Sequence, residues 1–188
     1  MDDKVVYYKS LRKKFLTFKV LVTVALLLIL IAGAVGGYKL YESHQAANNA
    51  AKKQQAAFNS VLATAQTYAN KGNFQAEFIT LQDEIGKTKT KTQELTLYGE
   101  LAPTALNVNE YSQAISYYKI RHELDPSTVQ ADADTLGQCY LDIGDKADAL
   151  AQYKIALAYY KAQPQTPTLA ANGTIPFIQA QVDNLEGN

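Results

Sequence analysis

Nineteen consecutive residues without a charge, Val20 to Tyr38, lie between Lys19 and Lys39. A helix rises about 1.5 Å per residue, so a run of this length nearly spans the roughly 30 Å hydrocarbon core of a bilayer. A helix also satisfies its own backbone hydrogen bonds, which lipid cannot do. The run therefore predicts a membrane-spanning helix over residues 20–38, and the rest of the chain should work beside a membrane.

The zero net charge of the chain hides two oppositely charged parts. Residues 1–19 hold six basic and two acidic side chains, whereas residues 39–188 hold twelve basic and sixteen acidic ones. Because basic flanks stay in the cytoplasm, we expect a basic cytoplasmic arm at 1–19 and an extracytoplasmic C-terminal domain in the cell membrane. The alternative is a cleaved signal peptide ending near Ala32–Ala34, although the basic region and the apolar run are both long for one.

The composition excludes several classes of protein. The single cysteine, Cys139, rules out an internal disulfide and is expected to be a small buried hydrophobe. An acidic extracytoplasmic part argues against nucleic-acid binding. The two histidines, His44 and His122, fall in different predicted elements, and no zinc, calcium, dinucleotide or P-loop motif occurs. We therefore expect no catalytic site, no metal and no cofactor, and the chain is interpreted as a non-enzyme.

Beyond the span the sequence is helical throughout. Residues 39–57 are rich in Ala and Gln and predict a helical stalk. From residue 58 the apolar residues recur at spacings of three and four, with no sustained alternation, which indicates an all-α domain. An offset of 35 residues aligns Leu101 with Leu136, and Asn109 with Gly144. Such a period is typical of stacked helical repeats.

Residues 136–157 closely resemble a tetratricopeptide repeat (TPR), residues 98–126 resemble a second copy, and an earlier copy fits loosely, with Glu77 where the family has a small Ala. The resemblance implies antiparallel helix pairs that stack into a short α-solenoid, with about three repeats over 58–163 and a linker and capping helix over 164–188. The residues at its packing positions are Tyr68, Gly72, Tyr98, Leu101, Ala114, Tyr118, Leu136, Gly137, Tyr140, Gly144, Ala149, Tyr153 and Ala156.

Two local predictions concern the end of the chain and an acidic cluster. Thr174 is expected to cap the final helix, whose apolar stripe holds Ile175, Phe177, Ile178, Val182 and Leu185. The acidic residues Asp132, Asp134, Asp142, Asp145 and Asp148 are interpreted mainly as solvated surface charges, with a divalent-ion site as the alternative.

In the TPR family the first helix of each pair lines a concave groove that receives peptides. By position, the resemblance makes the following residues groove candidates: Asn59, Leu62, Gln66, Asn70, Leu106, Asn107, Asp134, Gln138, Leu141 and Asp142. None is basic, so an extended neutral or basic segment would suit this groove better than a peptide carboxylate. The alternative is that the protein's own helices fill it.

The layout resembles that of a bacterial family of single-pass ancillary subunits of the SecYEG translocon, and the stretch from Gly37 to Gln45 is similar to theirs. This resemblance implies an adaptor for protein export, whose protein or peptide partners include the translocon and chaperones. A scaffold subunit of pilus, secretion or cell-wall machinery is the alternative. The sequence leaves the oligomeric state open.

Overall fold

The computed structural model describes residues 2–164 and 173–187, with side chains from Lys19 onward. Every regular element within those residues is helical, which confirms the all-α prediction. The elements are α1 (Asp2–Asn70), α2 (Phe74–Gln82), α3 (Lys91–Asn107), α4 (Tyr111–Leu124), the short 3-10 turn η1 (Pro126–Thr128), α5 (Val129–Asp142), α6 (Lys146–Ala162) and α8 (Thr174–Glu186). The predicted linker falls largely on residues 165–172, which lie outside the described part.

The chain divides into two compact units, Met1–Gln55 and Ala56–Asn188, with the boundary inside α1. The first unit is a single stretch of helix. Its large apolar side chains from Val20 to Tyr41 are 42% to 69% exposed, so none of these side chains is buried in a hydrophobic core. By length and composition this helix is able to cross a membrane. We call the second unit the helical domain.

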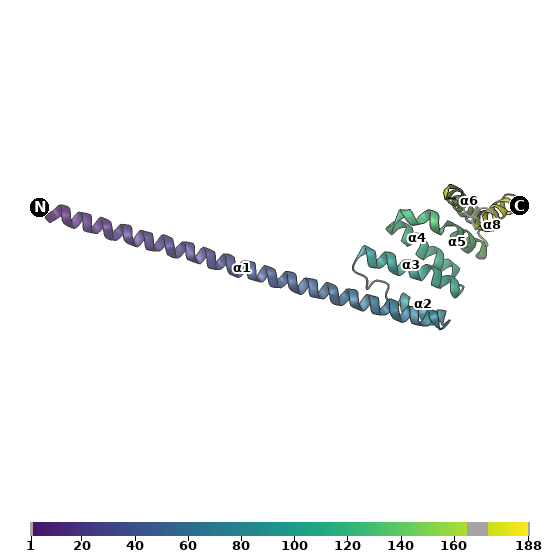
Figure 1. Cartoon of the computed structure of the whole chain (residues 1–188), viewed down its shortest axis with the longest axis horizontal. Coiled ribbons are helices and arrows are strands. Elements are labelled where there is room, and N and C mark those ends of the chain that lie inside the picture. The colour runs from purple at the N-terminus through teal and green to yellow at the C-terminus, as the bar shows by residue number, and fades with distance from the viewer. Residues whose placement is uncertain (1, 165–172, 188) are drawn as a thin grey trace. The chain divides into compact units, whose positions relative to one another are not determined.

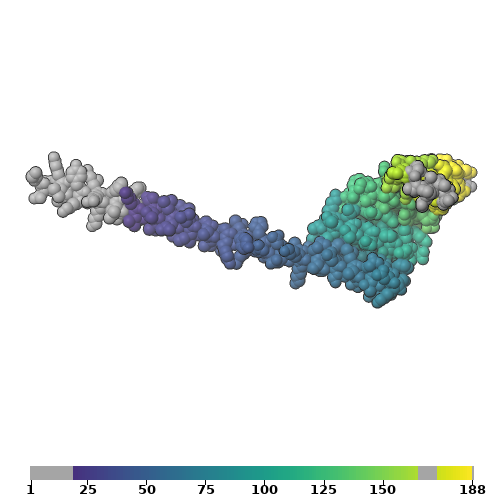
Figure 2. Space-filling view, viewed as in Figure 1, coloured from purple at the N-terminus to yellow at the C-terminus, as the bar shows by residue number. Residues whose placement is uncertain are grey.

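Within the helical domain each helix packs against its neighbours in sequence. The principal pairs are α2 with α3, α3 with α4, α4 with α5, α5 with α6, and α6 with α8. Figure 1 shows this order from α2 to α8, and in Figure 2 the colours of the domain follow one another from teal to yellow in the same order. A stack in which each unit contacts only the next is the arrangement of a helical solenoid.

The turn inside each helix pair has the same geometry in all three copies. Its central residue has a positive φ: 69° at Gly72, 62° at Asn109 and 82° at Gly144. The next backbone N–H then donates to a carbonyl five residues earlier: Asn73 to Tyr68 (2.9 Å), Glu110 to Ala105 (2.8 Å) and Asp145 to Tyr140 (2.8 Å). This pattern is a Schellman ending, in which Gly or Asn adopts the left-handed conformation. The first copy therefore has the same turn as the others, although its sequence fits loosely.

Side chains fix where several helices begin. Asn73 accepts a hydrogen bond from the N–H of Ala76 (3.2 Å), Thr90 from Gln93 (3.2 Å) and Asp145 from Asp148 (3.1 Å). Each bond satisfies one of the unpaired donors at a helix N-terminus. The prediction of a cap at Thr174 is wrong, because Gly173 occupies that position with no side-chain bond and Thr174 is already helical.

The core lies where the helices cross. Ala114 and Ala149 are completely buried, and the Tyr153 side chain fills the space between α5 and α6. In α8, Ile178 and Val182 are buried against the stack. The predicted stripe is wrong at Phe177, which is 54% exposed, because it lies on the opposite side of α8 from Val182. The side chains that cover one another here come from helices adjacent in sequence.

Candidate partner-binding groove

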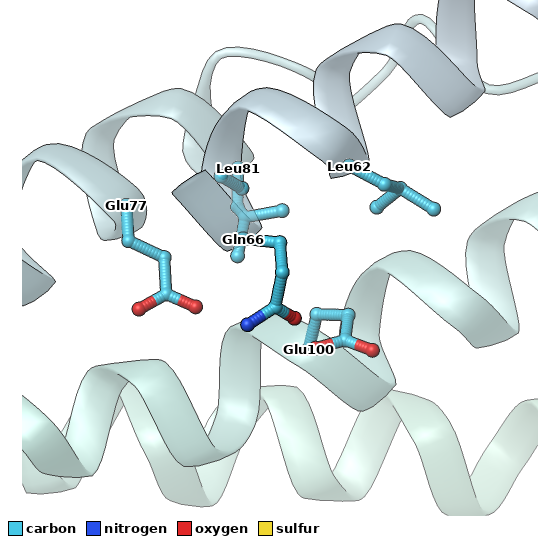
Figure 3. A pocket seen from close by; sticks show the side chains of 6 residues that line it. Leu62, Gln66, Glu77, Leu81 and Glu100 are labelled. Carbon is cyan, nitrogen blue, oxygen red and sulfur yellow. The ribbon is translucent and has the colours of Figure 1, made fainter. Parts of the chain in front are cut away.

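Two groove candidates of the first copy line a pocket formed by α1, α2 and α3. Leu62 and Gln66 from the last turns of α1 face Glu77 of α2 and Glu100 of α3 across a volume of about 60 Å³. Ala65 and Leu81 complete the lining. Figure 3 shows Gln66 between the two carboxyl groups. Asn59 and Asn70 from the same copy are exposed and lie outside the lining.

Glu77 is the unexpected member of this pocket. It lies at the position that Ala114 and Ala149 hold in the other two copies, where the same backbone bond begins the second helix. Only 7% of its surface is exposed. Its Oε1 is 3.2 Å from the Thr104 hydroxyl, and its Oε2 has no hydrogen-bond partner. Burial raises the pKa of Glu77, the Thr104 hydrogen bond lowers it, and the charge of Glu100 raises it again.

The Thr104 hydroxyl is a weak donor to Glu77 because it has a shorter alternative. It lies 2.8 Å from the backbone oxygen of Glu100, one helical turn earlier. A hydroxyl has one hydrogen, so both acceptors share it. Leaving a buried carboxylate oxygen without a donor costs about 1–3 kcal/mol or more. The sequence shows that Glu77 is larger than the Ala expected at this position, but it does not show that Glu77 lines a pocket. It gives no indication that Glu100 belongs to the same pocket.

The second-copy candidates lie at the end of α3. Leu106 is half-buried against the hydrophobic core, and Asn107 is exposed. Neither lines the pocket of Glu77. Pro103 lies inside the same helix and has no N–H for the carbonyl of Gly99, one turn earlier. The structure therefore keeps these two candidates apart from those of the first copy.

The third-copy candidates are engaged by α6. Tyr160 Oη donates to Asp134 Oδ2 (3.1 Å), and Tyr153 Oη donates to Gln138 Oε1 (3.2 Å). Gln138 Nε2 in turn donates to Asp142 Oδ1 (3.1 Å). Leu141 is half-buried against the core. A ligand would have to displace hydrogen bonds made within the repeat, so this copy favours the alternative that the protein's own helices occupy the groove.

The packing positions given by the repeat alignment fall into three groups. Most are buried in the helical domain: Leu101, Ala114, Tyr118, Leu136, Gly137, Tyr140, Ala149, Tyr153 and Ala156. Tyr68 and Tyr98 are half-buried. Gly72 and Gly144 lie in the exposed turns described above. The aligned positions within helices are thus buried or half-buried, and the two aligned glycines lie in the turns between helices.

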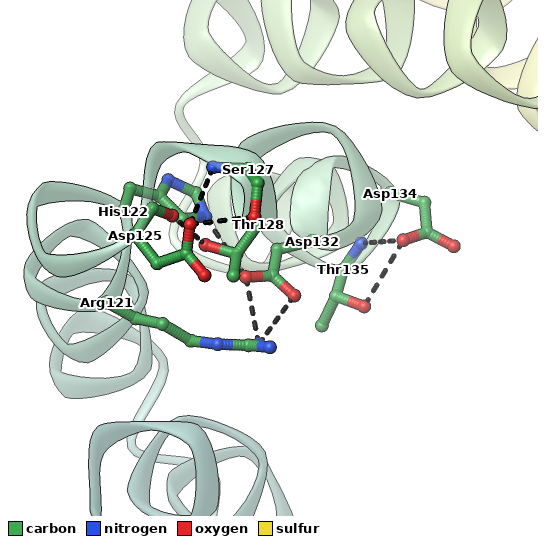
Figure 4. Close-up of polar contacts among 8 residues, drawn as sticks. All are labelled: Arg121, His122, Asp125, Ser127, Thr128, Asp132, Asp134 and Thr135. Carbon is green, nitrogen blue, oxygen red and sulfur yellow. Dashed lines mark hydrogen bonds and ion pairs between the residues drawn. The ribbon is translucent and has the colours of Figure 1, made fainter. Parts of the chain in front are cut away.

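One residue of the acidic cluster joins two repeats. Asp132 of α5 is 8% exposed and accepts hydrogen bonds from Arg121 Nη1 of α4 at 2.8 and 3.0 Å. His122 Nε2 of the same helix lies 3.1 Å from Asp132 Oδ2. Figure 4 shows both α4 side chains directed at this carboxylate. Asp132 is therefore an exception to the solvated charges expected for most of this cluster, because a part-buried contact with Arg121 holds it against α4.

Two further possibilities for a chemical site are a reactive thiol at Cys139 and a metal site. Cys139 is a free, buried thiol, and burial raises its pKa to about 11. A thiol of that pKa is protonated and unreactive at neutral pH. Among the described side chains, those of residues 19–164 and 173–187, no group of three His, Cys, Asp or Glu is placed to hold a metal ion.

Comparisons with known proteins identify structures with a similar fold. No protein-family profile matches the sequence, and no curated protein matches it. Two solved structures are similar to this chain. PcrH in complex with the chaperone binding region of PopD has a TM-score of 0.53 and 16% identity, covering 71% of this chain and 93% of PcrH. PcrH from Pseudomonas aeruginosa has a TM-score of 0.51 and 16% identity, covering 69% and 91%.

At this level of identity the likeness concerns the fold alone. The comparison therefore shows that the described helices are arranged much as they are in PcrH. The fold by itself does not assign a partner, because one fold serves many functions.

Proposed function

We propose that this chain is a single-pass membrane protein whose helical domain binds partner proteins or peptides outside the cytoplasm. Its first unit is the anchor, with the basic arm in the cytoplasm. The helical domain is a non-enzymatic adaptor that holds a partner close to the membrane. Its site of action in this proposal is the SecYEG translocon, where it serves as an ancillary factor for exported chains.

One observation carries the membrane part of the proposal. The apolar side chains from Val20 to Tyr41 are exposed along their whole length, and no other part of the first unit covers them. Monomeric soluble proteins rarely expose a contiguous apolar patch larger than a few hundred Å². A bilayer would cover every one of these side chains at once, and the helix already satisfies its own backbone.

Two observations support partner binding. The similar PcrH structure contains the chaperone binding region of PopD, so a helical stack of this kind has held a segment of another chain. In this chain, the pocket of Leu62, Gln66, Glu77 and Glu100 lies among groove candidates of the first copy. The translocon assignment rests on the layout and on the Gly37–Gln45 stretch.

The experiment has two parts in one preparation. Protease is added to sealed spheroplasts that contain the full chain, and the N-terminus of the mature protein is sequenced. The proposal expects digestion of the helical domain and an intact N-terminus. Protection of the domain, or a chain that begins after Ala34, would contradict the anchor and its orientation.

The partner is identified by photo-crosslinking from Gln66, with the exposed Glu123 of α4 as the matched position outside the pocket. Capture of the channel-forming subunits from Gln66 but not from Glu123 supports the translocon role. Capture of pilus, secretion or cell-wall assembly proteins in the same pattern would favour the alternative scaffold. Equal capture from both positions would contradict a partner-binding groove at this site.

A further inference from the structure

The pocket between α1, α2 and α3 has the chemistry of a receptor for a cation. Glu77 lines the pocket, is more than nine-tenths buried, and has no hydrogen-bond donor for its buried Oε2. Glu100 adds a second carboxyl group to the lining. None of the six lining residues, all within the described part of the chain, carries a positive charge. A buried carboxylate in this setting is stabilised by a donor that also supplies the opposite charge.

The other polar groups near Glu77 are already engaged. The Thr104 hydroxyl divides its hydrogen between Glu77 and the Glu100 backbone oxygen, which lies 0.4 Å closer, at 2.8 against 3.2 Å. The one amide in the lining, Gln66, donates through Nε2 to Asn70 Oδ1 (3.1 Å). None of the hydrogen bonds made by these groups reaches Glu77 Oε2, so a donor from outside the domain would complete the hydrogen bonding of this carboxylate.

The shape of the pocket selects among cations. A guanidinium binds best when two parallel N–H groups meet both oxygens of one carboxylate. At Glu77 a guanidinium would have to share Oε1 with the Thr104 hydroxyl, which already donates to it. An ammonium is a compact point charge that needs one strong acceptor at a time. The apolar walls of Leu62, Ala65 and Leu81 suit the methylene stem behind it.

We propose that this pocket binds the ammonium group of a lysine side chain carried by the partner, with Glu77 as the buried counter-charge and Glu100 at the rim. The inference deepens the proposed adaptor function and rests on it, since it specifies which feature of a partner the first copy recognises. It also accounts for a charged residue where the other two copies have a completely buried Ala.

A titration of the full chain in detergent micelles tests the pocket without any partner. The probe is n-butylammonium chloride, which matches the lysine side chain in length and charge. 1-Butanol is the neutral control, and sodium chloride holds the ionic strength constant. The carboxyl carbon resonance of Glu77 and the methyl resonances of Leu62 and Leu81 are followed by NMR. We expect saturable shifts with the ammonium and none with the alcohol.

Substitutions locate the binding. Glu77→Gln keeps the shape of the side chain and should weaken the ammonium at least about tenfold, the effect of losing a charge-assisted hydrogen bond. Glu100→Gln should weaken it less. Glu123→Gln makes the same chemical change on exposed α4 and should leave the titration unchanged. The wild-type carboxyl resonance gives a readout that does not depend on any variant folding.

Equal shifts from butanol and butylammonium, or unchanged binding in Glu77→Gln, would overturn the lysine pocket. Either result would leave the adaptor function untouched if crosslinking from Gln66 still captured a partner. Conversely, ammonium binding together with no specific crosslink would sustain the pocket and contradict the proposed partner-binding role.

Discussion

Gly137 offers the sharpest test of the packing between α5 and α6. It lies in the middle of α5, with the ring of Tyr153 from α6 directly against it. A Cβ added at Gly137 would lie 2.8 Å from Cε1, 2.9 Å from Cδ1 and 3.0 Å from Cγ of that ring. Tyr153 is completely buried, and its hydroxyl is hydrogen-bonded to Gln138, so the ring has no free space in which to move.

Two opposing effects set the stability of the Gly137→Ala variant. Replacing Gly by Ala inside a helix gains about 0.8–1 kcal/mol of helix propensity. Overpacking of a tight core costs about 1–3 kcal/mol, and three contacts near 3 Å against a trapped ring lie toward the upper end. The net loss should be about 1–2 kcal/mol, which lowers Tm by about 2–8 °C in a chain of this size.

Gly99→Ala is the matched control. Gly99 lies in helix α3, and a Cβ there would meet only Arg121 Nε, at an ordinary 3.9 Å. This variant should gain about 0.5–1 kcal/mol, so the two substitutions should have opposite signs. Near-ultraviolet circular dichroism of the tyrosines follows the packing during melting of the full chain. If Gly137→Ala melts at or above the wild-type temperature, the close approach of α5 and α6 is refuted.

A double-mutant cycle isolates the contact itself. Tyr153→Leu removes the ring and should be destabilising alone, because it leaves a cavity. In that background Gly137→Ala should be neutral or stabilising, which gives a coupling energy of about 1 kcal/mol or more. Strictly additive effects would show that the two residues do not interact.

Three further outcomes follow from single groups. Cys139, 1% exposed and with its pKa raised to about 11, should resist iodoacetamide at neutral pH until denaturant unfolds the domain; rapid labelling of the native chain would contradict its burial. Asp132→Asn leaves Arg121 without its carboxylate and should lower the free energy of unfolding by about 1–3 kcal/mol, as followed by thermal melting. An unchanged melting temperature would show that the pair is solvated. Burial raises the pKa of Glu77 above its ordinary 4.5, so the folded state holds its proton longer than the unfolded state. Its contribution to stability is therefore complete below about pH 4.5 and falls as pH rises through the folded pKa. Glu77→Gln should remove that fall, and a variant with the wild-type pH profile would contradict it.

The sequence predicts the local features of this fold well because each depends on a few adjacent residues. A Gly or Asn with positive φ ends the first helix of each pair, and the offset of Asn109 from Gly144 along the chain marks that turn. The all-helical class follows equally directly from apolar spacing. These signals depend on backbone sterics and on burial of one helix face. Residue type and apolar spacing show both of these features directly in the sequence.

Side-chain contacts between one helix and the next are harder to predict from the sequence. The position of Asp132 in a charge cluster suggests a solvated residue, yet Asp132 is buried and accepts hydrogen bonds from Arg121, eleven residues earlier. Gln138 and Asp134 look like groove residues by position, but the Tyr153 and Tyr160 hydroxyls of α6 engage them. Which partner a polar side chain meets depends on the crossing of two helices, and the repeat spacing does not specify it.

The first repeat shows how these two levels combine at Glu77. Its turn at Gly72 matches those of the other copies, so the backbone of the repeat is intact there. Its crossing residue differs from theirs, and an Ala at this position would avoid the cost of a buried carboxylate. This repeat keeps the turn of the other copies but carries a charged residue at the crossing, in the pocket between α1, α2 and α3. Stability alone favours the small residue there, so a requirement outside the fold accounts for the carboxylate, and the proposed cationic group on a partner would supply the counter-charge that Glu77 lacks.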